Sequence, residues 1–191
     1  EMCIRDSCTV TLSKIQSDGI DLEKAQALYL TSFPESERRD AKKWKDMVLA
    51  STSTLFALYK ISMDDAFAGI LSCWDFESFL YIEHFAINSQ QRGHGLGSAT
   101  LSAFRTLFPQ KPIVLEAEVP IEEMAIRRIQ FYQRNGFHVC DSPYMQPPYH
   151  QDGKWLDLKL LSTSPDFASK QFETIKRTIY HHVYNLSLIH I

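Results

Sequence analysis

Three glycines within five residues, Gly93, Gly95 and Gly97, stand directly before a stretch of good helix formers, SATLSAFRTLF. The first turn of a helix leaves about four backbone N–H groups without an acceptor and carries a partial positive charge, so it binds anions. Side chains at the three positions would fill the space that a pyrophosphate needs and would resist positive φ angles. Arg92 adds a positive charge where the loop begins. The segment therefore predicts a phosphate-binding loop at the start of a helix.

Two known phosphate-binding motifs fit this loop poorly. The P-loop needs a Lys followed by Ser or Thr after its last glycine, and no such pair follows Gly97. The dinucleotide motif GxGxxG, counted from Gly93, meets Ser98 at its third glycine position, although Glu116 lies about 20 residues further on, where a ribose ligand is expected. A dinucleotide-dependent oxidoreductase therefore stays as an alternative, beside an ordinary glycine-rich connection.

An isolated carboxylate, Glu83, lies in the apolar run FLYIEHFAI. Burying a carboxylate without a partner is costly and raises its pKa, which is how a general base is tuned. A structural ion pair or hydrogen bond is the alternative. His84 follows it along the same predicted strand, so we expect its side chain on the opposite face, as a core histidine.

The hydrophobic pattern predicts the elements that must position these residues. Strands are expected at residues 8–15, 53–61, 65–76, 79–87, 112–119, 137–140 and 154–161. Helices are expected at residues 21–33, 36–51, 97–108, 123–136 and 164–184. Ser36 is the expected cap of the second helix. The run 79–87 is apolar on both faces, which predicts the central strand of the sheet.

This order of elements contains one βαβ crossover, through the helix at 97–108, inside an otherwise antiparallel pattern. It predicts an α/β (α+β) fold with a mixed, mostly antiparallel central sheet flanked by helices, and with a C-terminal helix. We expect a single domain at residues 8–185. The ends, EMCIRDS at 1–7 and LSLIHI at 186–191, look like translated sequencing-adapter DNA, so we treat them as non-native remnants.

Composition narrows the class of protein. The chain has 191 residues, 45% of them apolar, and a formal net charge of -3, as expected of a soluble domain with a core. Apolar runs fall short of the roughly 18 residues of a membrane span, and basic residues form no stripe, so we expect neither a membrane nor a nucleic-acid partner. The four cysteines lack CxxC spacing and the seven histidines lack an HExxH pair. We therefore expect no metal site and a reduced, cytoplasmic setting.

The glycine loop and its surroundings resemble a known family. QRGHGLGSATL after YIEHFAI is similar to the acetyl-CoA signature of the GCN5-related N-acetyltransferases (GNAT), written Q/R-x-x-G-x-G/A. Arg92, Gly95 and Gly97 occupy its fixed positions. FYQRNGF, which includes Tyr132, matches the Tyr-x-x-x-Gly-Phe of a later family motif, and the element order matches that fold from about Cys8 to Leu161.

This resemblance implies how acetyl-CoA is bound. The N–H groups of the loop would hold the pyrophosphate, and the backbone of the preceding strand would pair with the pantetheine. The strand after the loop helix would splay away, so that thioester and acceptor meet in the opening. The residues implied in cofactor binding are Phe85, Ala86, Ile87, Arg92, Gly93, His94, Gly95, Leu96, Gly97 and Ser98.

Acetyl transfer to an amine needs a neutral nucleophile and a proton for the leaving thiolate. Tyr132 matches the family's general acid, with plain packing as the alternative. The family often has a glutamate on the central strand, which implies Glu83 as the general base. Glu116 and Glu118 are two residues apart and share one face of the next strand, where they line the acceptor pocket and attract a cationic amine, or serve as the base instead.

Two long loops, 32–40 and 142–153, are expected to select the acceptor, with Tyr144, Tyr149 and His150 as candidates, unless the proline-rich loop is only a rigid surface. The family motif departs at Ala125, where an Asn that contacts CoA is usual, and at Arg128, where a small residue is usual. Arg127 and Arg128 either meet a phosphate or an acidic acceptor, or form a solvated helix face.

We therefore expect an N-acetyltransferase that uses acetyl-CoA as cosubstrate and acetylates a primary amine of a small molecule, as a monomer or homodimer. A CoA-binding module without catalysis and an acetyltransferase acting on a protein or peptide amine are the alternatives within this fold.

Overall fold

The computed structural model describes residues 9–50 and 55–187. These ranges leave out the segment 1–7, which contains Cys3, and also Cys8. They also leave out the junction between the second predicted helix and the next predicted strand. The strands are β1 Val10–Lys14, β2 Phe56–Met63, β3 Ala66–Asp75, β4 Leu80–Ile87, β5 Ile113–Glu118, β6 His138–Val139, β7 Tyr144–Gln146 and β8 Leu156–Ser162. The helices are α1 Ile20–Ser32, η1 Glu35–Glu37, α2 Ala41–Leu49, η3 Ser89–Gln91, α3 Leu96–Leu107, α4 Glu123–Arg134 and α5 Pro165–His182.

One mixed sheet runs through the fold in the order β1-β2-β3-β4-β5-β8-β6, with β7 added to β8. Only β4 and β5 pair in parallel among the described strands, and α3 is the crossover between them. The predicted mixed, mostly antiparallel sheet with one βαβ crossover is confirmed. So is the central place of the 79–87 run, because β4 lies in the middle of this order.

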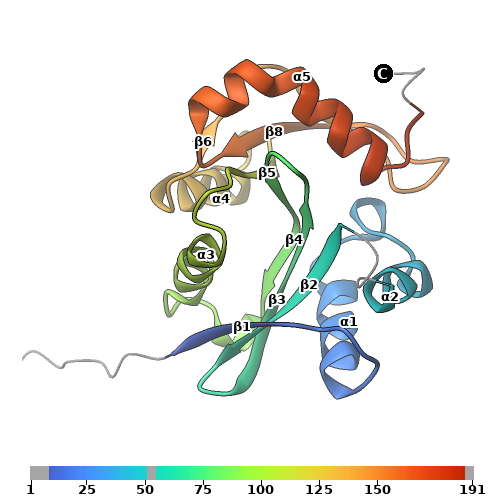
Figure 1. The fold of residues 1–191 in the computed structure, drawn as a ribbon, viewed down its shortest axis with the longest axis vertical. Helices are drawn as coiled ribbons and strands as arrows, with labels where there is room; N and C mark the ends of the chain where they lie inside the picture. The colour runs from blue at the N-terminus through green and yellow to red at the C-terminus, as the bar shows by residue number, and fades with distance from the viewer. Residues whose placement is uncertain (1–8, 51–54, 188–191) are drawn as a thin grey trace, which may run out of the picture.

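Two hydrophobic cores cover the two faces of the sheet. Helices α1, α2 and α5 pack on one face, with Tyr29, Trp44 and Ile175 fully or almost fully buried. Helices α3 and α4 pack on the other face through side chains such as Phe104 and Ile129. Figure 1 shows α1 and α2 on the opposite side of β2–β4 from α3, and α5 across the β5–β8 end. No helix in the described ranges is both long and apolar enough to cross a membrane.

Two local predictions are wrong. The N-cap of α2 is Asp40, not Ser36: its carboxylate accepts the backbone N–H groups of Lys42 at 2.9 Å and Lys43 at 3.2 Å. The chain before it forms the short helix η1 instead of a first α-helical turn. The strand β7 was not predicted, because its three residues are too few for an alternating pattern to be seen.

The sheet opens between β4 and β5. These strands pair only from Leu80–Ile113 to Ile82–Leu115; further along, β4 stays with β3 while β5 stays with β8. The register of β4 against β3 skips one residue, Glu83, which is a β-bulge. The parting of the two strands creates the space in which the predicted site residues lie.

The bulge also corrects the expected direction of His84. An extra residue reverses the alternation of side chains, so Glu83 and His84 lie on the same face of the sheet. His84 Nδ1 is 3.9 Å from Glu83 Oε1, and its ring packs edge-on against Tyr29 of α1. His84 is buried as predicted, with 3% exposure, but beside Glu83 and not opposite it.

Candidate active site

The glycine loop leaves backbone donors free at the start of α3. Gly93 and Gly95 have φ angles of 85° and 76°, the left-handed region that glycine adopts at little cost. Gly95 is the N-cap residue and makes no side-chain hydrogen bond. The first backbone bond of the helix runs from the Ala99 N–H to the Gly95 carbonyl, at 3.0 Å. The helical N–H groups before Ala99 therefore lack an intrahelical acceptor: Leu96, Gly97 and Ser98.

The three glycines serve two different purposes. A Cβ atom added at Gly93 or Gly95 would meet no heavy atom within 4 Å, so the loop faces open space. A Cβ atom at Gly97 would lie 3.1 Å from the Phe131 ring of α4. The expectation of a positive φ at all three glycines is wrong for Gly97, where the missing side chain instead lets α3 and α4 approach closely.

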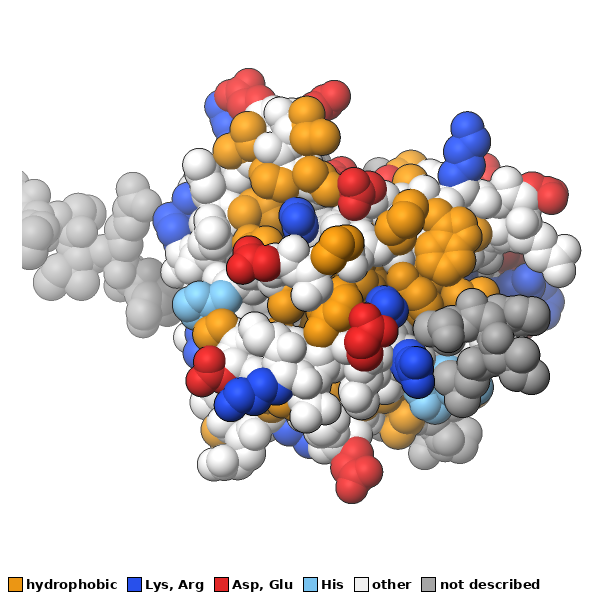
Figure 2. All heavy atoms as spheres, turned by 90° about the horizontal axis from the view of Figure 1, so that it is seen from above, with side chains coloured by type: hydrophobic (Ala, Val, Ile, Leu, Met, Phe, Trp, Pro, Cys, Tyr) orange, Lys and Arg blue, Asp and Glu red, His pale blue; other side chains and the backbone are white. Residues whose placement is uncertain are grey.

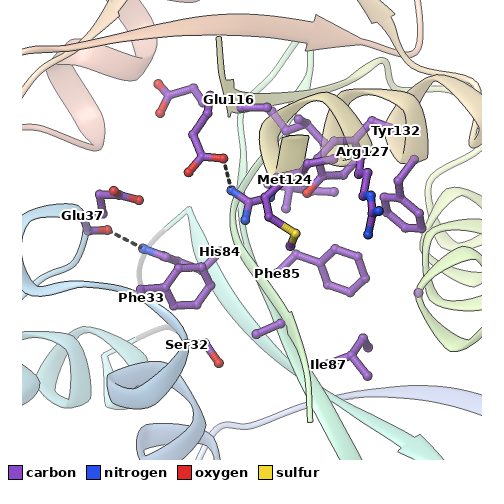
Figure 3. Close-up of a pocket in the computed structure, with 18 of the residues that line it drawn as sticks. Ser32, Phe33, Glu37, His84, Phe85, Ile87, Glu116, Met124, Arg127 and Tyr132 are labelled. Carbon is purple, nitrogen blue, oxygen red and sulfur yellow. Dashed lines mark hydrogen bonds and ion pairs between the residues drawn. The ribbon is translucent and has the colours of Figure 1, made fainter. Parts of the chain in front are cut away.

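A cavity of about 730 Å³ fills the opening between β4 and β5. Phe85, Ala86 and Ile87 line one wall, on a stretch of β4 that has only β3 as a strand partner in the described chain. Figure 3 shows Phe85 and Ile87 along this strand, with Phe85 beside Met124 of α4. Arg92 donates from Nε to the Ile87 carbonyl at 2.9 Å and so ties the glycine loop to the end of β4.

The residues expected to bind the cofactor are brought together along this cavity, with one exception. His94 is exposed and does not line it. The free backbone edge of β4 can accept an extended ligand as an added strand, and the free N–H groups of α3 can accept an anion at its end. The residues present therefore fit a long ligand that carries a phosphate group.

Glu83 lies at one side of the cavity, in a dense cluster of partners. Its side chain is 0% exposed and forms an ion pair with Arg39. Trp74 Nε1 donates to Glu83 at 2.7 Å, and the Tyr149 hydroxyl donates at 2.9 Å. The Arg39 guanidinium also lies 5.0 Å from the centre of the Tyr149 ring, a cation–π contact. The alternative of a structural ion pair is thus present at Glu83.

The expected rise in the pKa of Glu83 is wrong. Burial raises the pKa of this carboxyl, but Arg39 and then His84 and the Trp74 hydrogen bond oppose it, and the net pKa lies below its ordinary value. Burial lowers the pKa of His84, whose Nε2 makes a hydrogen bond with the Glu37 carbonyl at 3.2 Å. Glu83 is therefore held ionised by a neighbour that the pattern of β4 alone does not reveal.

Glu116 on β5 is partly buried in the same cavity and has a different set of partners. The Tyr144 hydroxyl donates to its Oε1. Gln146 Nε2 donates to Oε2 at 2.9 Å, and the Tyr184 hydroxyl donates to Oε2 at 2.8 Å. Burial raises the pKa of Glu116 to about 7, against the hydrogen bonds that lower it. Within the described chain, this carboxylate has no ion-pair partner.

Glu118, two residues further along β5, does have one. Arg128 of α4 pairs with it, and both side chains are nearly half exposed, at 46% for Arg128 and 44% for Glu118. Arg127 pairs with Glu123 one turn back on the solvent side of α4. Glu37 of η1 lines the same cavity. Burial is the larger cause that raises the pKa of the Glu37 carboxyl, and the negative charge of Glu118 is the smaller one.

Tyr132 lies on the α4 wall of the cavity and is 9% exposed. Burial raises the pKa of its phenol to about 12. Its ring packs edge-on against Phe131 and Phe137, while its hydroxyl has no hydrogen-bond partner within the described residues. The surroundings of Tyr132 are therefore compatible with both interpretations of the sequence, a general acid and plain packing.

The two long loops also hold partners of the site glutamates that the sequence pattern does not indicate. Arg39 and Gln146 lie in the two long loops that were expected to select the acceptor, but neither was singled out. Tyr144 is 1% exposed and does not line the cavity; it contacts Glu116 from behind. The His150 ring makes hydrogen bonds with the Glu35 and Arg38 carbonyls, at 3.1 Å each, and so joins the two loops. No group of His, Cys, Asp or Glu suited to hold a metal ion is found in the described ranges.

Comparison with known proteins identifies similar chains. The sequence profile of the acetyltransferase (GNAT) family matches residues 22–137. YjbC of Bacillus subtilis (strain 168), provisionally named as an acetyltransferase, is 27% identical over 151 residues, which cover 76% of this chain and 74% of that protein.

Solved structures extend the similarity over nearly the whole chain. A protein from Bacteroides thetaiotaomicron, provisionally named as an acetyltransferase of the GNAT family, is 34% identical with a TM-score of 0.86, covering 93% of this chain and 99% of that one. Naa50 of Arabidopsis thaliana, solved with the bisubstrate analogue CoA-Ac-MVNAL, is 20% identical with a TM-score of 0.57, covering 81% and 98%. Similarity at the latter level shows the shared fold.

Proposed function

The chain belongs to the GNAT family of acetyltransferases, and from this premise we propose that it acetylates a primary amine of a small molecule, with Glu116 as general base and Tyr132 as general acid. The enzyme class is that of an acyltransferase, and GNAT acetyltransferases use acetyl-CoA. The acceptor and the roles of individual residues are the proposed part.

The cavity supports acetyl-CoA as the cosubstrate. Gly93 and Gly95 leave open space beside the free N–H groups of α3, which would hold the pyrophosphate. The backbone of Phe85 to Ile87 would hold the pantetheine along the edge of β4. Bound there, acetyl-CoA supplies an acetyl group that is already activated as a thioester. The residues of the cavity then have to bind the amine, remove its proton and protonate the leaving sulfur.

The observation that carries the proposal is the unpaired carboxylate of Glu116. Arg39 neutralises Glu83 and Arg128 neutralises Glu118, whereas the partners of Glu116 are tyrosines and an amide. An alkylammonium group that enters the cavity can complete the missing ion pair. Because the pKa of Glu116 is raised by burial to about 7, its carboxylate can then accept a proton near neutral pH.

Glu83, the base expected from the family resemblance, is the weaker candidate. Its carboxylate already has a cationic partner, Arg39, in addition to the hydrogen bonds from Trp74 and Tyr149. Its side chain is inaccessible and its net pKa is lowered, which makes it a poor proton acceptor at neutral pH. We assign it instead to holding the bulge of β4 against the acceptor loops.

The surroundings of Tyr132 support a role as general acid. A phenol whose pKa is raised by burial to about 12 keeps its proton at neutral pH and can donate it as negative charge develops on sulfur. Its hydroxyl has no competing acceptor in the described chain. Tyr132 on α4 lines the same cavity as Glu116 on β5.

The test is a pH–rate profile of wild type, Glu116→Gln and Glu83→Gln, with CoA release followed by a thiol reagent. The probes are a diamine, an arylalkylamine, an amino alcohol and a peptide with a free N-terminus. We expect turnover of at least one small amine and loss of the acidic limb of kcat in Glu116→Gln but not in Glu83→Gln. Turnover of the peptide alone would exclude the small-molecule acceptor, and a limb that disappears only in Glu83→Gln would reverse the roles of the two glutamates.

A further inference from the structure

We propose that the C-terminal part of the chain completes the active site, with Tyr184, Tyr144 and Gln146 as positioning residues that hold the Glu116 carboxylate toward the cavity. All three lie outside the region matched by the family profile, residues 22–137. The inference rests on the proposed role of Glu116 as the base, and it assigns a task to β7 and to the segment after α5.

The three side chains donate hydrogen bonds to both oxygens of the Glu116 carboxylate. Tyr144 donates to Oε1, while Gln146 and Tyr184 donate to Oε2 at 2.9 and 2.8 Å. Gln146 Nε2 also donates to the Tyr184 hydroxyl at 2.6 Å, and that hydroxyl lies 3.5 Å from the hydroxyl of Tyr81 on β4. Because both oxygens are bound, the carboxylate cannot rotate freely, which keeps one orientation toward the cavity.

The position of Tyr184 is itself fixed from two sides. Helix α5 packs on the sheet through Phe172, Ile175 and Ile179, so the end of the helix is anchored. At the exit of the helix, the Val183 carbonyl accepts from Arg39 Nη2 at 2.6 Å. The Leu186 N–H bonds back to the Tyr180 carbonyl at 3.0 Å. Tyr184 lies between these two anchors and is 8% exposed.

The titratable groups that face Glu116 are tyrosines, and they come from each of the segments that pack around this carboxylate. They are Tyr81 of β4, Tyr144 of β7, Tyr149 of the following loop, Tyr180 of α5 and Tyr184 after it. None of these is charged at neutral pH, because burial raises the pKa of each phenol further. Hydrogen bonds from neutral donors stabilise the ionised carboxylate without cancelling its charge, so the charge remains available to a cationic acceptor.

The experiment removes one donor and follows the acidic limb of kcat with whichever amine the wild-type enzyme turns over. Tyr184→Phe takes one hydrogen bond from the carboxylate, which raises the pKa of Glu116 and moves the limb to higher pH by about one to two units. At pH 7 a shift of one unit corresponds to a loss of about five-fold in kcat, and the loss is regained above the new limb. Gln146→Met is the second variant, with a shift in the same direction.

Tyr180→Phe is the matched control. Its hydroxyl donates to the Met145 carbonyl and not to Glu116, so this variant loses a tyrosine hydroxyl from the same helix region while the limb stays where it is. A loss of kcat in Tyr184→Phe that is equal at every pH, or a limb that does not move in Tyr184→Phe and Gln146→Met, would overturn the inference.

The pH–rate profile of Glu116→Gln distinguishes a failure of this inference from a failure of the proposed function. If Glu116→Gln loses the limb while the two positioning variants leave it unmoved, Glu116 remains the base and only the inference fails. If Glu116→Gln keeps the limb, the assignment of the base itself fails.

Discussion

Replacing Arg39 by Met is expected to destabilise the protein strongly, because the pair of Arg39 and Glu83 is buried. The Arg39 side chain is 12% exposed and that of Glu83 is 0% exposed. The guanidinium also donates to the Val183 carbonyl at 2.6 Å and lies 5.8 Å from the centre of the Trp74 ring. Met retains the apolar stem of the side chain but leaves the Glu83 carboxylate without its cation.

The expected magnitude follows from this burial. Breaking a buried ion pair by removing one partner costs about 3 to 5 kcal/mol, since an uncompensated charge stays inside the protein. In a chain of this size each kcal/mol lowers Tm by about 2 to 4 °C. The Tm of Arg39→Met should therefore fall by about 6 to 20 °C at neutral pH.

The loss should depend on pH with a defined sign. In the wild type the pKa of Glu83 is lowered because Arg39 and its other partners outweigh burial, so the pair contributes stability above the unfolded pKa and loses it as pH falls. Without Arg39, burial dominates and raises the folded pKa, which penalises the ionised form until it is protonated. Both effects make the difference in Tm between variant and wild type largest near neutral pH and smaller toward about pH 4.

Thermal unfolding followed by circular dichroism at both pH values measures this difference. The double variant Arg39→Met with Glu83→Gln should be more stable than Arg39→Met alone, because it removes the orphaned charge. Lys42→Met is the control, since Lys42 pairs with Asp46 on the surface, with side chains 85% and 60% exposed, and should leave Tm unchanged. A Tm for Arg39→Met close to that of Lys42→Met would refute the reasoning.

Two further predictions concern the cavity. Tyr132→Phe keeps the ring contacts with Phe131 and Phe137 and should lower kcat by about a hundred-fold or more at unchanged affinity for CoA. Steady-state kinetics measure kcat, and titration calorimetry measures the affinity. Unchanged turnover would show that Tyr132 is not the general acid. Gly95→Ala forces a side chain onto a φ of 76° at a cost of about 1 to 2 kcal/mol and should weaken CoA binding. A thermal-shift assay measures this binding, because CoA at about a hundred times Kd adds about 2.7 kcal/mol to the stability of the wild type. An equal gain in Gly95→Ala would contradict the loop as the binding site. A gain with NAD would favour the dinucleotide alternative.

Local patterns were sufficient for the glycine loop and most elements. The spacing of Gly93, Gly95 and Gly97 before a helical stretch depends on backbone geometry within a few residues, so it predicted the free helix start that the structure contains. The double-sided apolar run of β4 likewise predicted a central strand. Short-range exceptions remain, such as Asp40 capping α2 in place of Ser36, because several residues in that stretch can cap a helix.

The electrostatic state of the site could not be predicted from the same patterns. Glu83 and Glu116 both lie in predicted strands rich in apolar residues, yet one has a lowered pKa and the other a pKa raised by burial to about 7. The difference comes from Arg39, 44 residues from Glu83 along the chain, whose charge outweighs burial there. At Glu116 burial outweighs the hydrogen bonds that lower its pKa, including the one from Tyr184, 68 residues away. No periodicity links residues at such separations, so the sign of each shift is set by packing alone.

The sequence by itself determined the family, the mixed sheet and the loop at which a phosphate can bind, since these depend on local spacing and on the order of elements. The tertiary structure decided which carboxylate pairs with an arginine and which has no ion-pair partner among the described residues. A bulge at Glu83 brings it and His84 to one face, and the chain after α5 returns to bring the Tyr184 hydroxyl to Glu116. Charge pairing acts through space over a few ångströms, so it follows the folded neighbours of a residue and not its neighbours along the chain.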